Sequence, residues 1–114
     1  IGAVRMAELR LTPAAMKDLE NIKEYISKTL CNPIAAQRTV KRIVDDYTLL
    51  KVSPFMGTPL SSKVAVKTDY RYLVSGNYIV FYKADEKYVS IYRILYGRRD
   101  YIKILFGNFA NDEE

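Results

Sequence analysis

Hydrophobic positions in the first half of the chain recur at the spacing of helices. A short alternating segment at residues 7–11 is followed by apolar residues three or four positions apart over 13–30, and again over 33–52. Thr12 and Asn32 each stand before a proline, and a proline suits the first helical turn because its missing N–H needs no partner there. The pattern predicts a strand and then two helices, which the very short connection folds into an antiparallel hairpin.

From residue 63 onward the apolar period changes from helical to alternating. Runs rich in β-branched and aromatic residues cover 70–75, 78–84 and 88–96, with tight-turn sequences between them. Lys63–Val66 is expected to add a short edge strand, and Arg99–Phe106 a last short helix. The predicted fold class is α+β: an N-terminal strand, an antiparallel helical hairpin packed on a three- to four-stranded antiparallel sheet, and a short C-terminal helix. The hairpin would cover one face of the sheet, and the other face, or its edge near the last strand, would be open to a ligand.

Positive charge and tyrosine concentrate in the second half of the chain. The net charge is +5, and residues 61–104 carry nine Lys/Arg against four Asp/Glu. Eight of the ten tyrosines lie in the same segment. A solvated basic surface would account for the positive charge. It would account less readily for the concentration of tyrosines in the same segment. The combination favours a phosphate backbone or an acidic protein as partner.

Other sequence features narrow the class of protein. The single Cys31 excludes an internal disulfide framework and fits a reducing cytoplasm. No apolar run is long enough to span a bilayer, so no membrane contact is expected. The chain has no histidine and contains no zinc-ligand spacing, Gly-rich phosphate loop or Ser-His-Asp set, so neither a metal nor a cofactor is expected.

The length of 114 residues predicts one domain. The first residue is not a methionine, and Met6 is a candidate native start that would make Ile1–Arg5 an extension or an expression remnant. The acidic end of the chain, within residues 108–114, is expected to be a flexible tail.

The last predicted strand runs directly into a cluster of cationic and aromatic residues. Arg98, Arg99 and Lys103 follow it, and Tyr96 and Tyr101 flank the arginines. Guanidinium groups bind phosphate or carboxylate through two parallel hydrogen bonds, and tyrosines offer stacking faces. Adjacent arginines at a strand exit point in different directions. We therefore expect one to pair with a nearby acid or helix terminus and the other to face a ligand.

Arg93 is expected to have a structural role. It alternates with Ile91 and Leu95 and so would share their face of the strand. A buried arginine needs an acidic partner, for which Asp69 and Asp85 are the candidates.

Two segments resemble the RelE/ParE superfamily of bacterial toxins from type II toxin–antitoxin modules. Residues 93–100, RILYGRRD, are similar to the family's strand ending R-[IV]-L-[HY]-G-R-x-D. Ser53–Gly57, SPFMG, resembles the P-x-x-G connection that follows the helical hairpin in that family. Together with the order β-α-α-β-β-β, the resemblance covers roughly residues 7–106.

The resemblance implies a toxin with one of two kinds of target. RelE-like members cut mRNA in the ribosomal A site without a metal, whereas ParE-like members poison DNA gyrase without cleaving a nucleic acid. We rank a ribosome-dependent mRNA interferase first, a gyrase poison second, and an inactive homologue that only binds antitoxin third. All three imply a cognate antitoxin, whose acidic and apolar segment would dock over the arginine cluster and the groove between hairpin and sheet.

The interferase hypothesis assigns particular residues. Arg71 and Arg99 would stabilise phosphate, and Tyr101 would take part in proton transfer, while Lys103 would assist proton transfer or positioning. Contacts to RNA or to another target are expected from Arg98, Lys103, Tyr96 and Lys67. The pair Arg71 and Arg99 is the reason for ranking cleavage first.

Three positions depart from the RelE pattern. Leu73 replaces a lysine, Ile79 replaces an arginine, and Leu105–Phe106 stands where the C-terminal catalytic tyrosine is expected. The RelE-like set is therefore half present. The long helical hairpin and the Arg-Arg-Asp ending are also common among gyrase-directed members.

Overall fold

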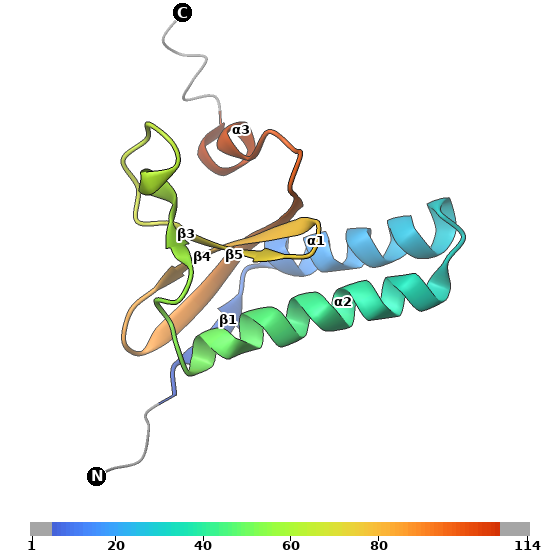
Figure 1. The fold of residues 1–114 in the computed structure, drawn as a ribbon, viewed down its shortest axis with the longest axis horizontal. Coiled ribbons are helices and arrows are strands. Elements are labelled where there is room, and N and C mark those ends of the chain that lie inside the picture. Colours follow the sequence, from blue (N-terminus) through green and yellow to red (C-terminus); the bar gives the residue numbers. More distant parts are fainter. Residues whose placement is uncertain (1–5, 108–114) are drawn as a thin grey trace, which may run out of the picture.

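The strands form one mixed five-stranded sheet in the order β1-β5-β4-β3-β2 (Figure 1). The computed structural model describes residues 6–107. The strands are β1 (Glu8–Leu11), β2 (Thr58–Pro59), β3 (Arg71–Ser75), β4 (Tyr78–Ala84) and β5 (Tyr88–Tyr96). β1 runs parallel to β5 and all other neighbours are antiparallel. The predicted α+β class is confirmed, and the N-terminal strand makes the sheet mixed.

The helical hairpin lies along one face of this sheet (Figure 1). α1 (Pro13–Glu24) continues as one turn of π-helix, η1 (Tyr25–Thr29), and α2 (Pro33–Thr48) continues as a 3-10 turn, η2 (Leu49–Lys51). The side chains of Thr12 and Asn32 each accept a hydrogen bond, at 3.0 Å, from the amide three residues later. Both predicted caps are confirmed, and they satisfy amides that have no partner within the helix.

The main core lies between the hairpin and the sheet. Alternate residues of β4 and β5 meet one stripe of each helix there, because strand side chains alternate faces and helical ones repeat every three or four positions. Its buried members include Ala15, Ile22, Ile43, Leu50, Val80, Tyr82, Val89, Ile91 and Ile94. Met16 and Leu30, which share the apolar spacing of α1, are nevertheless exposed.

Part of the second face of the sheet is covered as well, which leaves the edge near the end of β5 as the more open of the two expected ligand surfaces. α3 (Tyr101–Phe106) packs there, on the side of the sheet opposite the hairpin (Figure 1). With the 3-10 turn η3 (Leu60–Ser62), it covers a small apolar cluster built around Phe81 and Leu95. This arrangement follows from the amphipathic sequence of α3, whose apolar side chains would otherwise face water.

The edge strand is β2 and not Lys63–Val66, so that prediction was wrong. Residues 63–66 form turns and bends, whereas Thr58 pairs with Tyr72. Pro59 lacks an amide hydrogen, which an edge strand tolerates because nothing pairs with its outer side. The Leu60 amide then donates to the Tyr70 carbonyl at 2.9 Å and closes the connection.

Some expectations fall on the ends of the chain. The predicted extension at residues 1–5 and the predicted tail at 108–114 lie outside the described residues. Within residues 6–107, no helix combines the length and the apolar character needed to cross a bilayer. In that same part of the chain, no three His, Cys, Asp or Glu side chains gather as metal ligands would. Cys31 is exposed in the turn of the hairpin.

Candidate functional site

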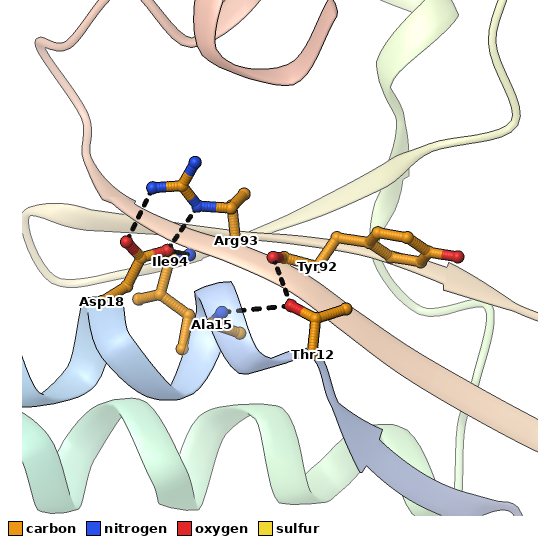
Figure 2. Close-up of polar contacts among 6 residues, drawn as sticks. All are labelled: Thr12, Ala15, Asp18, Tyr92, Arg93 and Ile94. Carbon is orange, nitrogen blue, oxygen red and sulfur yellow. Dashed lines mark hydrogen bonds and ion pairs between the residues drawn. The ribbon is translucent and has the colours of Figure 1, made fainter.

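A partly buried ion pair joins α1 to the end of β5 (Figure 2). Asp18 is only 7% exposed, and its carboxylate accepts hydrogen bonds from Arg93 Nε at 2.7 Å and from an Arg93 terminal nitrogen at 2.8 Å. It also accepts the Ile94 amide at 2.9 Å. Close by, the Thr12 hydroxyl donates to the Tyr92 carbonyl at 2.8 Å. These bonds set where the residues after Ile94 emerge from the sheet.

A β-bulge decides the face of β5 on which Arg93 lies. The register pairs Phe81 with Arg93 and Tyr82 with Ile91, so Tyr92 is an extra residue on β5. The bulge shifts the alternation by one position, and Arg93 shares the face of Phe81 and not that of Ile91. The predicted structural role of Arg93 is confirmed. The predicted sharing of a face with Ile91 is wrong, whereas the sharing of a face with Leu95 is confirmed.

Neither expected acidic partner of Arg93 is its partner. Asp69 forms an ion pair with Lys83 at 3.3 Å. Asp85 accepts the amides of Tyr88 and Lys87 at 2.7 and 2.8 Å in the β4–β5 turn, and these hydrogen bonds lower the pKa of Asp85. Both acids are therefore engaged elsewhere, and Arg93 pairs with Asp18 instead.

The Arg93 guanidinium is committed to the fold. The hydrogen bonds that it donates to Asp18 raise the pKa of Arg93, so it is cationic at every practical pH. Its positive charge is neutralised by Asp18 and is not offered to a ligand. Arg98 and Arg99, which β5 delivers just beyond the ion pair, are two cations at this end of the sheet that form no ion pair with residues 6–107.

A groove of about 770 Å³ opens between the tip of the hairpin and the ends of β4 and β5. We call it the hairpin groove; its lining includes Tyr25, Leu30, Ala35, Tyr78, Tyr96 and Arg99. The walls are largely apolar and aromatic, and Arg99 provides a cation. A second hollow of about 240 Å³ adjoins it across Tyr78 and Tyr96, with Arg98 in its lining.

Three tyrosines meet in the hairpin groove. The rings of Tyr78 and Tyr96 make an edge-to-face contact with their centroids 5.9 Å apart. Burial raises the pKa of Tyr78, and Tyr96 and Tyr25 raise it further. The Tyr78 hydroxyl is therefore neutral at physiological pH, and the tyrosines supply rings and hydrogen bonds, not charge.

The two adjacent arginines diverge, as expected for a strand exit. Arg99 lines the hairpin groove and Arg98 lines the smaller hollow. Neither forms an ion pair with any residue in the range 6–107, so the expectation that one would pair with an acid is not met. Asp100 instead caps α3 by accepting the Lys103 amide at 3.2 Å.

The three residues predicted to act in RNA cleavage are not brought together. Arg71 is the register partner of Tyr82, whose ring lies in the core under the hairpin. Tyr101 packs against Phe81 on the opposite face, with ring centroids 5.1 Å apart. Arg99 emerges beyond the Tyr78 end of β4, about 13 Å along the strand from Tyr82 at the usual rise per residue.

The other predicted contact residues are spread over the surface. Tyr96 lies between the two hollows, as part of both linings. Lys103 is exposed on α3, and Lys67 is exposed in the connection before β3. Of the predicted set, only Tyr96, Arg98 and Arg99 form a contiguous group.

At the other end of β4, a buried hydroxyl holds the loop that follows α2. Tyr82 Oη accepts the Gly57 amide at 2.9 Å, and an Arg71 terminal nitrogen donates to the Phe55 carbonyl at 2.9 Å. A Cβ at Gly57 would collide with the Tyr82 hydroxyl and lie 2.7 Å from the Tyr72 carbonyl. Glycine is therefore required here for close approach, which explains its place in the SPFMG segment.

Comparison of this sequence with known protein families agrees with the fold and the motifs. The family model described as "ParE toxin of type II toxin-antitoxin system, parDE" matches residues 9–101. The chain belongs to the ParE toxin family. The match runs from β1 to the start of α3 and includes the SPFMG and RILYGRRD segments, so the predicted family is confirmed.

Two solved structures share the fold of this ParE-family toxin. A chain of the chromosomal ParDE toxin–antitoxin system from P. aeruginosa is 24% identical with a TM-score of 0.67, over 81% of this chain and 97% of that one. A chain of the toxin–antitoxin complex RelBE2 from Mycobacterium tuberculosis is 16% identical with a TM-score of 0.56, over 84% and 97% of the two chains. No curated protein sequence matches this one.

Sequence reasoning missed several residues of this ParE-family toxin. Asp18 is not among the acidic partners predicted for Arg93, although it lies three residues after Ala15 and four before Ile22. That spacing places it on the buried stripe, which was the available signal. Tyr25 and Tyr78 gave no comparable signal, because the hairpin groove joins segments far apart in the chain.

Loss of the Tyr82 hydroxyl is expected to loosen the loop. In Tyr82→Phe the Gly57 amide stays buried without an acceptor, and the free energy of unfolding should fall by about 1–3 kcal/mol. Urea unfolding followed by circular dichroism measures the change. Tyr25→Phe is the control, because Tyr25 is exposed and should unfold as the wild type does. Equal stability of Tyr82→Phe and the wild type would contradict this role.

Proposed function

We propose that this ParE-family toxin arrests growth by binding DNA gyrase and does not cleave RNA. The observation that carries the proposal is the separation of the residues that cleavage would need. Arg71 and Tyr101 lie on opposite faces of the sheet, and α3 covers part of the face to which Tyr101 belongs. Proton transfer and phosphate stabilisation must act on one reacting group within hydrogen-bond reach.

A binding function makes fewer demands on these residues. A gyrase-directed toxin needs a stable surface that fits a protein, not a base and an acid aligned on one phosphate. The family to which the chain belongs also favours this hypothesis over a ribosome-dependent mRNA interferase. Both targets are cytoplasmic, so the proposal places the toxin in the cytoplasm.

We further propose that a cognate antitoxin occupies the hairpin groove. Both solved structures that share the fold come from toxin–antitoxin systems. In this chain the groove has apolar and aromatic walls, and Arg99 is one of its lining residues. Arg98 lines the adjoining hollow. An amphipathic segment with apolar side chains and carboxylates fits such a surface.

A single preparation of purified toxin tests both candidate targets, DNA gyrase and ribosome-bound mRNA. Purified toxin is added to a gyrase supercoiling assay and, separately, to a cell-free translation reaction in which mRNA 5′ ends are mapped. We expect blocked supercoiling and intact mRNA, with supercoiling restored when antitoxin is added first. New ribosome-dependent 5′ ends with normal supercoiling would replace this proposal by the interferase hypothesis. Normal supercoiling, intact mRNA and unaffected growth would indicate a homologue that only binds antitoxin.

A further inference from the structure

Large apolar side chains are exposed where the chain leaves α2. Leu49, Val52, Phe55 and Met56 lie within eight consecutive positions and are each about half exposed, between 47% and 57%. We call these four residues the loop surface. Isolated apolar residues are common on protein surfaces, but several grouped together usually mark a contact with another molecule.

The backbone beneath the loop surface is held firmly. Arg71 donates to the Phe55 carbonyl, Tyr82 accepts the Gly57 amide, and the Ala7 amide donates to the Lys51 carbonyl at 2.8 Å. The two bonds from β3 and β4 come from the body of the sheet. Because the loop is already ordered, a partner that binds there loses little free energy in ordering it.

The loop surface lies far from the hairpin groove. It begins at the C-terminal end of α2, whereas the groove lies beside the tip of the hairpin, where α2 starts (Figure 1). The 16 residues of α2 separate the two ends by about 24 Å. One protein can therefore occupy the loop surface while the groove is empty or filled.

The charges beside the loop surface are positive and unneutralised. Lys51 and Arg71 form no ion pair with any other residue between 6 and 107. The acids at the end of α2, Asp45 and Asp46, already pair with the lysine and arginine one turn earlier. The Arg71 guanidinium carbon also lies 5.4 Å from the centre of the Phe55 ring, so cation and ring form one unit.

We propose that the loop surface is where the toxin docks onto its protein target, separately from the antitoxin. The fitting partner is a folded protein that presents apolar side chains next to a carboxylate. Phe55 is the anchor, Met56, Val52 and Leu49 are the other exposed apolar residues of the surface, and Lys51 and Arg71 supply positive charge for the carboxylate. This inference rests on the proposed function, in which the target is a protein and not an RNA.

The test compares exposed apolar residues at the two ends of the molecule. Phe55→Ser and Leu49→Ser alter the loop surface, and Ile34→Ser is the matched control, because Ile34 is 64% exposed at the tip of the hairpin and does not line the groove. Thermal unfolding checks that all three variants fold. Binding of each to purified DNA gyrase is measured by biolayer interferometry, together with supercoiling and growth after induced expression.

We expect Phe55→Ser and Leu49→Ser to weaken gyrase binding by about tenfold or more, and Ile34→Ser to bind as the wild type does. Wild-type gyrase binding by both loop variants would overturn the inference and leave the proposed function intact. If the wild type neither binds nor inhibits gyrase, the proposed function fails, and growth arrest becomes the test of the loop surface. Arrest that is lost in Phe55→Ser and Leu49→Ser but kept in Ile34→Ser supports the loop surface, and equal arrest by all three variants overturns it. A wild type that arrests nothing overturns both.

Discussion

Replacing Asp18 by alanine is expected to lower the free energy of unfolding by about 3 kcal/mol or more. The substitution leaves the Arg93 guanidinium partly buried beside α1 without its counterion, and it removes the acceptor of the buried Ile94 amide. An unpaired buried charge costs more than the ion pair itself contributes, because desolvation is no longer compensated. Urea unfolding monitored by circular dichroism measures the loss.

An exposed ion pair is the control for Asp18→Ala. Lys41 and Asp45 approach to 2.6 Å, but their side chains are 76% and 59% exposed, and Asp45→Ala should cost less than about 1 kcal/mol. In Asp18→Ala/Arg93→Met no charge is left unpaired, so part of the stability should return, although the Ile94 amide still lacks its acceptor. Equal losses in Asp18→Ala and Asp45→Ala would show that the buried pair does not join α1 to β5 as inferred.

The combined change Leu30→Glu and Arg99→Glu is expected to weaken antitoxin binding by about 100-fold. Both residues line the hairpin groove, one in its apolar wall and the other as its cation. The two glutamates of the variant would repel the carboxylates of an acidic amphipathic segment. Isothermal titration of the purified toxin variant with its cognate antitoxin measures the affinity.

The matched control carries the same change in charge outside the groove. Ile34→Glu and Lys103→Glu replace one exposed apolar residue and one exposed cation, and neither residue lines the groove. This control should bind antitoxin within a few-fold of the wild type. If the two double variants lose equal affinity, general charge and not the hairpin groove governs antitoxin binding. Gyrase inhibition by the groove variant should persist, because the loop surface is unchanged.

Local patterns in the sequence were sufficient for most of the secondary structure. Side-chain caps before Pro13 and Pro33 began both helices where expected. Alternating runs predicted β4 and β5 with the observed bounds, because one strand face alternates with the other at every residue. The edge strand was misplaced, since two residues of β2 containing a proline carry almost no alternating signal.

The candidate site was less predictable than the fold. Arg98 and Arg99 diverge as a strand exit requires, a consequence of local geometry. Which residues would face them was not visible, because the hairpin groove joins the tip of the hairpin to the ends of β4 and β5. The coverage of the second sheet face by α3 likewise depends on contacts between distant segments.

The sequence by itself determined the elements of this toxin, their order and its family, because caps, periodicity and the RILYGRRD and SPFMG segments act over a few residues. Only the tertiary structure decided that Arg93 pairs with Asp18, because packing of α1 beside β5 brings together two residues that lie 75 positions apart in the chain. It also decided that Arg71 and Tyr101 lie on opposite faces, because strand register and helix packing place residues that are distant in the chain.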